Sequence, residues 1–438
     1  MLKEKQIIRT SVHSTKFANV GKLNNLNMFI NEYRICAQYM IDYIWSNGYE
    51  FIDSKKCKRT FDIEQNLLEL PSMLLSSIVS NANIETILTG RALKCCMTQV
   101  SGIIRAETEK QRKRINILNK LKIKKQPRRQ RQQLINKLKK NIPVKPNASN
   151  IFPELNSICA DFKIKDNDFS RFDGFIRLKS ITKTKLDIKI PIKFSKHSKR
   201  LMENGVLKPS FLIGKNKIDL RWDINIKPKI TGKTVGADQG MKTVLSFSDN
   251  QITPKKDIHG NTLESIIDKK VRRVRGSKSF KRAQDQEVNF INWSINQINF
   301  SNIQQVNLEE IKNINYKNKT SSKMFYWRNT LIRDKMCSRC ELLGVQVKHQ
   351  SSTYRSQRCS CCGMVKKSNR KGKTYTCSNC GLIIDSDINA SRNHEQSIPE
   401  IPYSFSKFKL NRIGFFWLET GLFDLKGESL QSLLPENT

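Results

Sequence analysis

Apolar and polar residues follow two different periods along the first half of the chain. Residues 5–13 have the composition of a strand. Apolar residues then recur at helical spacing, at Phe29, Tyr33, Cys36, Met40 and Ile44. The pattern is helical again from about residue 92 to residue 140, where the sequence becomes strongly basic. These spacings predict a short strand that leads into a helical region.

After Pro143 and Pro146 the apolar period changes to two, which is typical of strands with one buried face. The alternation is clearest at Leu186, Ile188, Ile190, Ile192 and Phe194, and again at Ile218, Leu220, Trp222, Ile224 and Ile226. Residues 214–217, Gly-Lys-Asn-Lys, separate the two runs and have the composition that a hairpin turn favours. We therefore expect an antiparallel β domain over about residues 148–230.

Strands and helices alternate after about residue 231, which predicts an α/β domain. A strand over residues 234–238 comes first, and a later helix has its apolar stripe at Val288, Ile291, Ile295 and Ile298. A helical stretch over about residues 323–343 ends at Gly344, a common helix stop, and residues 345–347 return to strand. The cysteine-rich segment that follows is therefore expected to be inserted in the α/β domain.

The charge of the chain indicates its partners. Lys and Arg number 79 against 39 Asp and Glu, which gives a formal net charge of +40 over 438 residues. Such an excess predicts a polyanionic partner, and nucleic acid is favoured over an anionic membrane surface. No apolar run reaches the roughly 18 residues of a membrane span, and the N-terminus lacks the apolar core of a signal peptide. We therefore expect an intracellular protein, with about two to four domains.

The basic helical region contains the first candidates for contact with phosphate. A run of charges is often only a solvated helix face, but here the density of one sign favours nucleic acid binding that weakens with salt. The candidate residues are Arg112, Arg114, Lys124, Arg128, Arg129 and Arg131.

Four of the twelve cysteines have the spacing of a metal site. They form the pattern Cys-x2-Cys-x14-Cys-x2-Cys, at Cys359, Cys362, Cys377 and Cys380. Four thiolates complete the coordination of a structural Zn²⁺ and leave no position open for a catalytic water. Gly363 and Gly381 follow the pairs and allow the tight turns by which backbone amides approach the thiolates. We expect Cys361 to be a bystander, and Cys337 and Cys340, which lack a second pair, to be structural.

Three carboxylates lie at the ends of predicted elements in the α/β domain. Asp238 and Glu309 end two predicted strands, and Asp387 begins a helical run after the apolar residues 382–384. Each alone is a weak signal, because an Asp before a turn is common and Asp387 can simply cap its helix. Together they can hold two divalent cations about 4 Å apart, as phosphodiester hydrolysis requires. With only five histidines in the chain, a mechanism based on His is less attractive.

Residues 231–395 resemble the RuvC-like nuclease domain of TnpB proteins and of the related miniature type V CRISPR effectors. The resemblance rests on the segments 236–240 (Gly-Ala-Asp-Gln-Gly), 306–309 (Val-Asn-Leu-Glu), 354–363, 375–381 and 385–390 (Asp-Ser-Asp-Ile-Asn-Ala). It implies that Asp238, Glu309 and Asp387 are catalytic and bind Mg²⁺ or Mn²⁺. Asp385 and Glu310 are less favoured substitutes. The chain departs from the family pattern after the first acid, where Gln239 replaces the usual apolar residue.

The resemblance also implies an α/β multidomain architecture. An RNase H-like (RuvC) nuclease domain with an inserted zinc ribbon follows a β-barrel wedge domain, which a helical recognition domain interrupts. The expected boundaries are 1–18 for the first wedge strand, 19–147 for the recognition domain, 148–230 for the wedge barrel, 231–350 for the first two nuclease motifs, 351–384 for the ribbon, 385–415 for the third motif and 416–438 for a tail. Arg275, Lys278 and Lys281, in the linker between the first two motifs, are expected to contact nucleic acid.

Proteins of this family bind a structured guide RNA and cut complementary double-stranded DNA beside a short motif, so that base pairing provides specificity. We therefore expect an RNA-guided DNA endonuclease that acts as a monomer or homodimer on one guide RNA. Its partners would be the guide, the target duplex and the displaced strand, with no membrane, in a prokaryotic cytoplasm close to the nucleoid. One alternative is an RNA-guided DNA-binding regulator with little cleavage, which the presence of all three acids disfavours. The other is a transposase acting without guide RNA, which the position of the cysteines disfavours.

Overall fold

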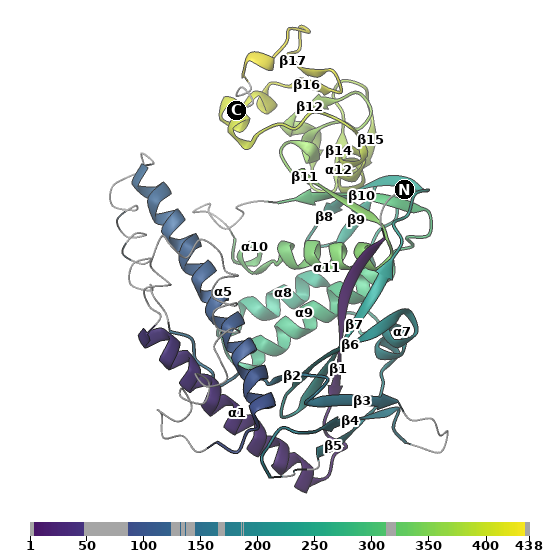
Figure 1. Cartoon of the computed structure of the whole chain (residues 1–438). Coiled ribbons are helices and arrows are strands. Elements are labelled where there is room, and N and C mark those ends of the chain that lie inside the picture. Colours follow the sequence, from purple (N-terminus) through teal and green to yellow (C-terminus); the bar gives the residue numbers. More distant parts are fainter. Residues whose placement is uncertain are drawn as a thin grey trace. The chain divides into compact units, whose positions relative to one another are not determined.

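The computed structural model describes residues 4–47, 86–123, 132, 136, 145–164, 171–184, 186, 188–311 and 321–433. The chain divides into two compact units (Figure 1). One unit is Gln6–Asn225, and the other combines Met1–Lys5 with Ile226–Thr438. We refer to them as the N-terminal unit and the C-terminal unit.

The N-terminal unit begins with strand β1 (Lys5–Ser14), which leads into the long helix α1 (Val20–Asn47). The apolar stripe predicted for this helix is confirmed at Phe29, Tyr33, Cys36 and Met40, which are all buried. Helix α5 (Gly90–Ile123) packs along α1, and the hydroxyl of Tyr33 donates a hydrogen bond to Oε1 of Gln99 across the pair (2.9 Å). The predicted strand and helices are therefore present in this unit.

Two antiparallel sheets complete the N-terminal unit. Their elements are β2 (Glu154–Asn156), β3 (Ala160–Ile164), β4 (Gly174–Leu178), β5 (Ile188–Ile192), α7 (Lys196–Asn204), β6 (Gly205–Ile213) and β7 (Lys217–Ile226). The sheet orders are β1-β7-β6-β2 and β3-β4-β5. The predicted hairpin joins β6 to β7, where the amide of Gly214 donates to the carbonyl of Lys217. The antiparallel strands are confirmed, and closure of the strands into a barrel stays a prediction.

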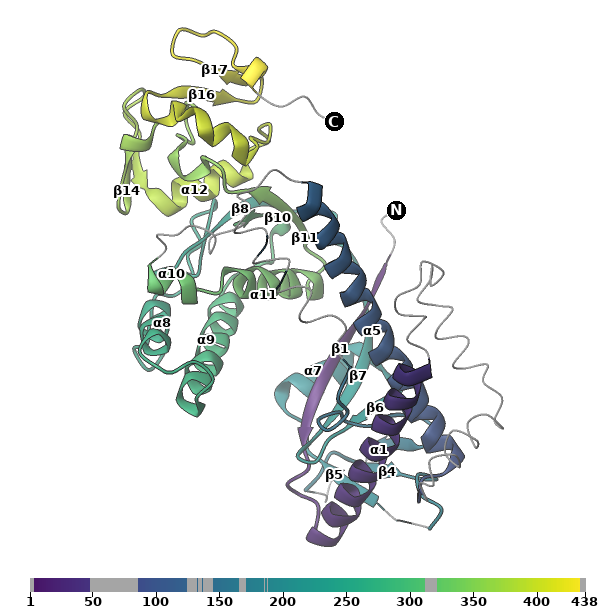
Figure 2. The ribbon, with the colours of Figure 1, turned by 90° about the vertical axis from the view of Figure 1, so that its left-hand side faces the viewer.

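The C-terminal unit is built on a mixed sheet in the order β11-β10-β8-β9. Its elements are β8 (Lys233–Gln239), β9 (Leu245–Phe247), α8 (Leu263–Val271), α9 (Lys278–Asn296), β10 (Ile303–Glu310), α10 (Ser322–Tyr326), α11 (Asn329–Leu342) and β11 (Gln346–Ser351). Strand β10 pairs in parallel with both β8 and β11, whereas β9 is antiparallel to β8. Helices α8 to α11 lie on one side of this sheet (Figures 1 and 2).

The helices of this unit differ from the predicted pattern in two places. The predicted stripe of α9 holds at Ile291 and Ile295, but Val288 is only partly buried and Glu287 takes an interior position. Glu287 is accommodated because Nζ of Lys270 on α8 lies 2.7 Å from its carboxylate, and both side chains are 1% exposed. The helix predicted over 323–343 is two helices, α10 and α11, because Trp327 turns to extended backbone and packs into the core.

The last part of the chain forms a small β module around the cysteines. It contains β12 (Met364–Val365), β13 (Arg370–Lys371), β14 (Thr374–Thr376), β15 (Ile383–Asp385), α12 (Ser386–Glu395), β16 (Phe415–Leu418) and β17 (Gly421–Phe423), with 3-10 turns at Arg355–Gln357, Lys367–Asn369, Tyr403–Phe408, Leu410–Arg412 and Gln431–Leu433. Strand β16 pairs with β12, and buried Phe415, Trp417 and Leu422 pack against Tyr354 and Phe405. Part of the segment 416–438, which was expected to be a tail, therefore packs against the cysteine module.

Helix α12 covers the face of the main sheet opposite to α8–α11 (Figures 1 and 2). Gly236 on β8 makes this close packing possible, because any side chain there would overlap the carbonyl of Ser391 and the amide of Glu395. Among the described helices, none combines the length and the apolar character that crossing a bilayer requires.

Candidate active site

Two of the predicted acids lie side by side at the carboxyl ends of neighbouring parallel strands. Asp238 is near the end of β8 and Glu309 near the end of β10, and Leu308 is paired with Ala237 just before them. Gln239 fixes the second acid, since its backbone N–H donates to Oε2 of Glu309 (3.2 Å) and its side-chain amide donates to the Glu309 carbonyl (2.7 Å). The residue that departs from the family pattern therefore holds Glu309 in place.

The two carboxyl groups disturb each other's ionisation. Burial raises the pKa of Asp238 well above its usual value, and the charges of Glu309 and Asp387 raise it further. Burial also raises the pKa of Glu309, to about 7, against the opposing effects of the Gln239 amide and of a hydrogen bond with Asp238. Without a cation, this pair favours holding a proton between its two carboxyl groups.

The third acid, Asp387, enters from the first turn of α12 and is buried. The sequence allowed a role for Asp387 as the N-cap of this helix, but Asp387 does not have that role. Asp385 is the N-cap, because its Oδ1 accepts from the amides of Asp387 (2.8 Å) and Ile388 (3.3 Å). The capping role of Asp385 leaves the carboxylate of Asp387 available for other partners.

Asp387 is instead paired with two cations of the cysteine module. Nζ of Lys373 forms an ion pair with Oδ2, and Nη2 of Arg370 lies 3.5 Å from Oδ1. Asp387 is near enough for its charge to raise the pKa of Asp238. The group of potential ligand atoms within 4.8 Å of one another, however, contains Asp238 and Glu309 but not Asp387 in the described part of the chain.

The member of that group which the sequence did not indicate is His394, on the last turn of α12. It is fully buried, and its Nδ1 lies 3.3 Å from Oε1 of Gln350 on β11. Burial, followed by the charge of Arg355, keeps the pKa of the imidazole well below its usual value, so the ring is neutral. The available signal was its position seven residues after Asp387, two turns along the same helix face.

Polar side chains of α12 connect the acids to the cysteine module. Asn389 accepts from the amide of Ser360 (3.0 Å) and donates to the carbonyl of Arg358 (2.7 Å). Asn393 donates to the carbonyls of Arg355 (2.9 Å) and Arg358 (2.7 Å). The loop that carries the first cysteine pair is therefore bonded directly to the helix that carries Asp387.

The four predicted metal cysteines converge. Their sulfur atoms lie within 4.8 Å of one another, with 3.6 Å between Cys359 and Cys380 and 3.6 Å between Cys362 and Cys377. Gly363 and Gly381 have positive φ, and their amides donate back to Cys359 and Cys377, so the predicted tight turns are confirmed. Four thiols in this arrangement are suited to a zinc ion.

The other cysteines singled out by the sequence lie outside this cluster. Cys361 is exposed, and Cys340 is buried in the core of the α/β sheet. Cys337 lines a cavity of about 760 Å³, with its sulfur 3.8 Å from Nε2 of His349. Within the described residues, none of the three belongs to a group of metal-ligating side chains.

The predicted contacts with nucleic acid are only partly visible. Arg275, Lys278 and Lys281 are exposed around the start of α9. Arg112 and Arg114 lie on α5, but their side chains are outside the described part of the structure, as are the residues Lys124, Arg128, Arg129 and Arg131. All of these contacts stay predictions.

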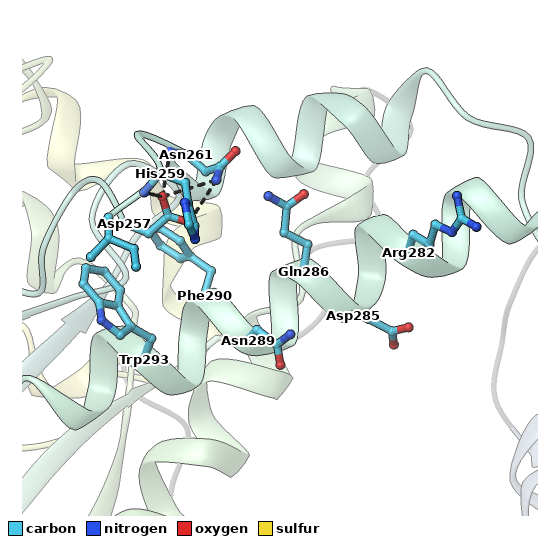
Figure 3. Close-up of a pocket in the computed structure, with 10 residues that line it drawn as sticks. Asp257, His259, Asn261, Arg282, Asp285, Gln286, Asn289, Phe290 and Trp293 are labelled. Atoms are coloured by element: carbon cyan, nitrogen blue, oxygen red, sulfur yellow. Dashed lines mark hydrogen bonds between the residues drawn. The ribbon is translucent and has the colours of Figure 1, made fainter. Parts of the chain in front are cut away.

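A cavity of about 490 Å³ lies between α9 and the turn at residues 257–261. Phe290 and Trp293 point toward the turn, while Arg282 and Asp285 lie further along the helix (Figure 3). Asp257 organises the turn by accepting hydrogen bonds from the amides of His259 (2.9 Å) and Asn261 (2.8 Å). None of the three predicted acids lines this cavity.

The residues present at the acidic site fit a divalent cation. Carboxylate oxygens are the ligands that Mg²⁺ and Mn²⁺ prefer, and a cation would stabilise the ionised forms of both carboxyl groups, whose pKa values burial raises. A buried imidazole nitrogen without a hydrogen-bond partner among the described residues lies in the same group. The donor set therefore suits a divalent cation, with oxygen ligands in the majority.

Comparison with known proteins agrees with this geometry. Residues 331–394, from α11 to His394, match the family described as Cas12f1-like, TNB domain. The match confirms the predicted resemblance to TnpB proteins and miniature type V effectors for this segment. No curated protein matches the chain.

Three solved structures are similar to the chain at low sequence identity. A Cas12f1–sgRNA–target DNA complex has 12% identity, covers 89% of this chain and 99% of that one, and gives a TM-score of 0.29. The mini-RNA-guided endonuclease CRISPR-Cas_phi3 has 8% identity, coverage of 90% and 93%, and a TM-score of 0.48. An AacC2c1–sgRNA binary complex has 8% identity, coverage of 86% and 70%, and a TM-score of 0.41. Because the identities and TM-scores are this low, the interpretation of the site rests on the family match and on the geometry of the site.

Proposed function

We propose, from the Cas12f1-like TNB segment and the acids beside it, that the chain is an RNA-guided DNA endonuclease. It would bind a structured guide RNA and cleave complementary DNA next to a short motif by metal-dependent hydrolysis of a phosphodiester bond. The mixed sheet β11-β10-β8-β9 and α12 would form its RNase H-like (RuvC) domain.

The observation that carries the proposal is the pair Asp238 and Glu309, which lie side by side at the ends of the parallel strands β8 and β10 and whose pKa values burial raises. Perturbed carboxyl groups at the ends of parallel strands are typical of active sites. Bound divalent cations there would supply an activated water and stabilise the negative charge on the leaving oxygen. We assign Asp238, Glu309 and Asp387 to hold these cations, Mg²⁺ or Mn²⁺.

The side chains around the acids support the same assignment. Arg370 and Lys373 now neutralise Asp387, and they would turn to phosphate oxygens of the DNA once a cation takes their place. The four clustered cysteines would hold a structural Zn²⁺ that keeps the hairpin β13–β14 in position beside α12.

The partners follow from charge and from the family. A net charge of +40 suits two nucleic acid partners, the guide RNA and the target duplex with its displaced strand. We propose that Arg275, Lys278 and Lys281 contact one of these strands, and that the basic helical region around Arg112–Arg131 contacts another. Binding of either partner should weaken steeply with salt.

The test is cleavage of a linear target duplex by purified protein, loaded with the RNA that copurifies with it, in Mg²⁺ or Mn²⁺. We expect Asp238→Ala to abolish cutting while guide and target binding in gel-shift assays persist. Asp285→Ala, which removes an exposed carboxylate on α9, is the matched control and should cut normally. Unchanged cutting by Asp238→Ala would remove this mechanism.

The same experiment separates the two alternative functions. A DNA-binding regulator would bind the target in the presence of RNA but leave it intact with either metal. A transposase would cut or join element ends without added RNA. Loss of cutting after ribonuclease treatment, restored by the copurified RNA, would favour the guided endonuclease over both.

A further inference from the structure

We propose that Nε2 of His394 is a direct ligand of the divalent cation held by Asp238 and Glu309. The inference rests on the metal site of the proposed function and deepens it, because it adds a nitrogen ligand to a set of carboxylates. The observation behind it is that a carboxylate oxygen of Asp238, one of Glu309 and a ring nitrogen of His394 lie within 4.8 Å of one another.

Burial makes an unused nitrogen at this place costly. His394 is 0% exposed, and its Nε2 has no hydrogen-bond partner within the described ranges. A buried polar atom without a partner typically costs about 1–3 kcal/mol. A cation between the three side chains would bind the nitrogen and the two carboxylates together. One ion therefore accounts for the unpartnered nitrogen of His394 and for the burial of the carboxyl groups of Asp238 and Glu309.

The second ring nitrogen defines which tautomer is present. Nδ1 lies 3.3 Å from Oε1 of Gln350, an acceptor, so Nδ1 carries the proton and Nε2 carries the lone pair. Metal-binding histidines usually donate their other N–H to an oxygen in this way, which orients the ring and fixes the tautomer.

The strand pairing also places Gln350, the partner of Nδ1, at the site. Gln350 lies opposite Glu309 in the parallel pair β10–β11, so the residue that orients the imidazole is held beside one of the two acids. On the other side, the main chain of α12 is fixed at His394 because its carbonyl accepts from Nδ2 of Asn307 (2.9 Å). Strand β11 therefore orients the ring of His394 through Gln350, and strand β10 holds the main chain of His394 through Asn307.

A nitrogen ligand changes the metal that the site prefers. Mg²⁺ binds almost entirely through oxygen, whereas imidazole suits later divalent metals and Mn²⁺ accepts both. The proposed site therefore favours Mn²⁺ over Mg²⁺ more strongly than three carboxylates would. His394→Phe, which keeps an aromatic ring but has no lone pair, should raise the Kd for Mn²⁺ by about tenfold or more.

The decisive measurement is electron spin-echo modulation of Mn²⁺ bound to the purified full-length protein. A directly coordinated imidazole gives a nitrogen coupling, which should be present in the wild type and change when the protein is labelled with ¹⁵N-histidine. The coupling should disappear in His394→Phe and in His394→Gln, which offers an oxygen instead. It should persist in His349→Ala, a control at an exposed histidine.

Two results would overturn the inference: no histidine nitrogen coupling in the wild type, or a coupling that persists in both His394 variants. If those variants fail to fold, Asp238→Asn and Glu309→Gln replace them, since loss of the ¹⁵N-sensitive signal in both places the histidine at the acidic site, and survival in both refutes it. Nitrogen coupling without guided cleavage would refute the proposed function only. Guided cleavage without nitrogen coupling would refute only the role of His394.

Discussion

The cysteine cluster and the acidic cluster each gather potential metal ligands within 4.8 Å, but the chain builds them in different ways. The cysteines all come from residues 359–380, where tight turns at Gly363 and Gly381 shape the two pairs and the hairpin β13–β14 lies between them. The acids Asp238 and Glu309 are far apart in sequence and meet only because β8 and β10 pair in parallel. The cysteine cluster therefore depends on one short segment, whereas the acidic cluster depends on the tertiary fold.

The two clusters also differ in what a bound metal ion would do for them. Four thiolates fill a tetrahedral coordination sphere, so the ion there is closed to substrate and serves structure. In the proposed active site, a cation held by Asp238 and Glu309 would also bind water and phosphate, and it would stabilise the ionised forms of the two buried carboxyl groups, whose pKa values burial raises. The contrast predicts that a substitution in the cysteine cluster disturbs folding of the cysteine module, whereas a substitution in the acidic cluster lowers the rate of cleavage.

The strongest test of this contrast is Cys377→Ser. Structural zinc sites provide about 10–16 kcal/mol of apparent binding energy, which is coupled to folding of the segment around them. We expect the variant to lose its zinc and residues 359–385 to become sensitive to protease, as measured by metal analysis and limited proteolysis. Cys361→Ser, an exposed neighbour, should keep both the zinc and the protection. Equal zinc content in the two variants would remove the structural role of the cluster.

The next largest effect should come from Asp387→Asn. Loss of a metal-binding carboxylate removes several kcal/mol of transition-state stabilisation, so guided cleavage should slow by about a thousandfold or more while the melting temperature changes little. The matched control is Asp385→Asn, because Asn caps a helix as well as Asp does. Cleavage rates measured under single-turnover conditions should be close to wild type for Asp385→Asn. The reverse order of the two variants would make Asp385 the third acid.

The same contrast explains which parts of the molecule were predictable. The cysteine site and the strands of both units follow local rules of spacing and period, and the structure confirms them. His394 and Gln239 were missed because their roles arise only when β8, β10, β11 and α12 come together. Glu287 was missed in the stripe of α9 for a similar reason, since its partner Lys270 lies on another helix. The pairing of Asp387 with Lys373 also required the folded hairpin β13–β14.

A smaller effect, again confined to the acidic cluster, is the pH dependence of metal binding. The raised pKa of Glu309, about 7, means that the metal-free site holds a proton below neutral pH, and a cation must displace it. The Kd for Mn²⁺ should therefore rise as the pH falls below 7, by about tenfold per pH unit, as measured by isothermal titration calorimetry. Zinc retention by the cysteine cluster should be unchanged between pH 6 and pH 8. A Mn²⁺ affinity that does not vary over this range would mean that the acids do not share a proton.

The smallest effect tests one of the two ion pairs that join the cysteine module to Asp387, the pair with Lys373. Lys373 neutralises Asp387, and its side chain is 44% exposed, so solvent screens the ion pair and reduces its value to about 0.2–1 kcal/mol. Lys373→Met removes a competitor for the carboxylate and should tighten Mn²⁺ binding in the absence of nucleic acid by up to about fivefold. Lys371→Met, an exposed neighbour on β13, is the control and should leave the affinity unchanged. Weaker Mn²⁺ binding in Lys373→Met would show that the lysine organises Asp387 for the metal instead of competing with it. In that case the cysteine module would contribute directly to metal binding by the acids, and its role would not be structural alone.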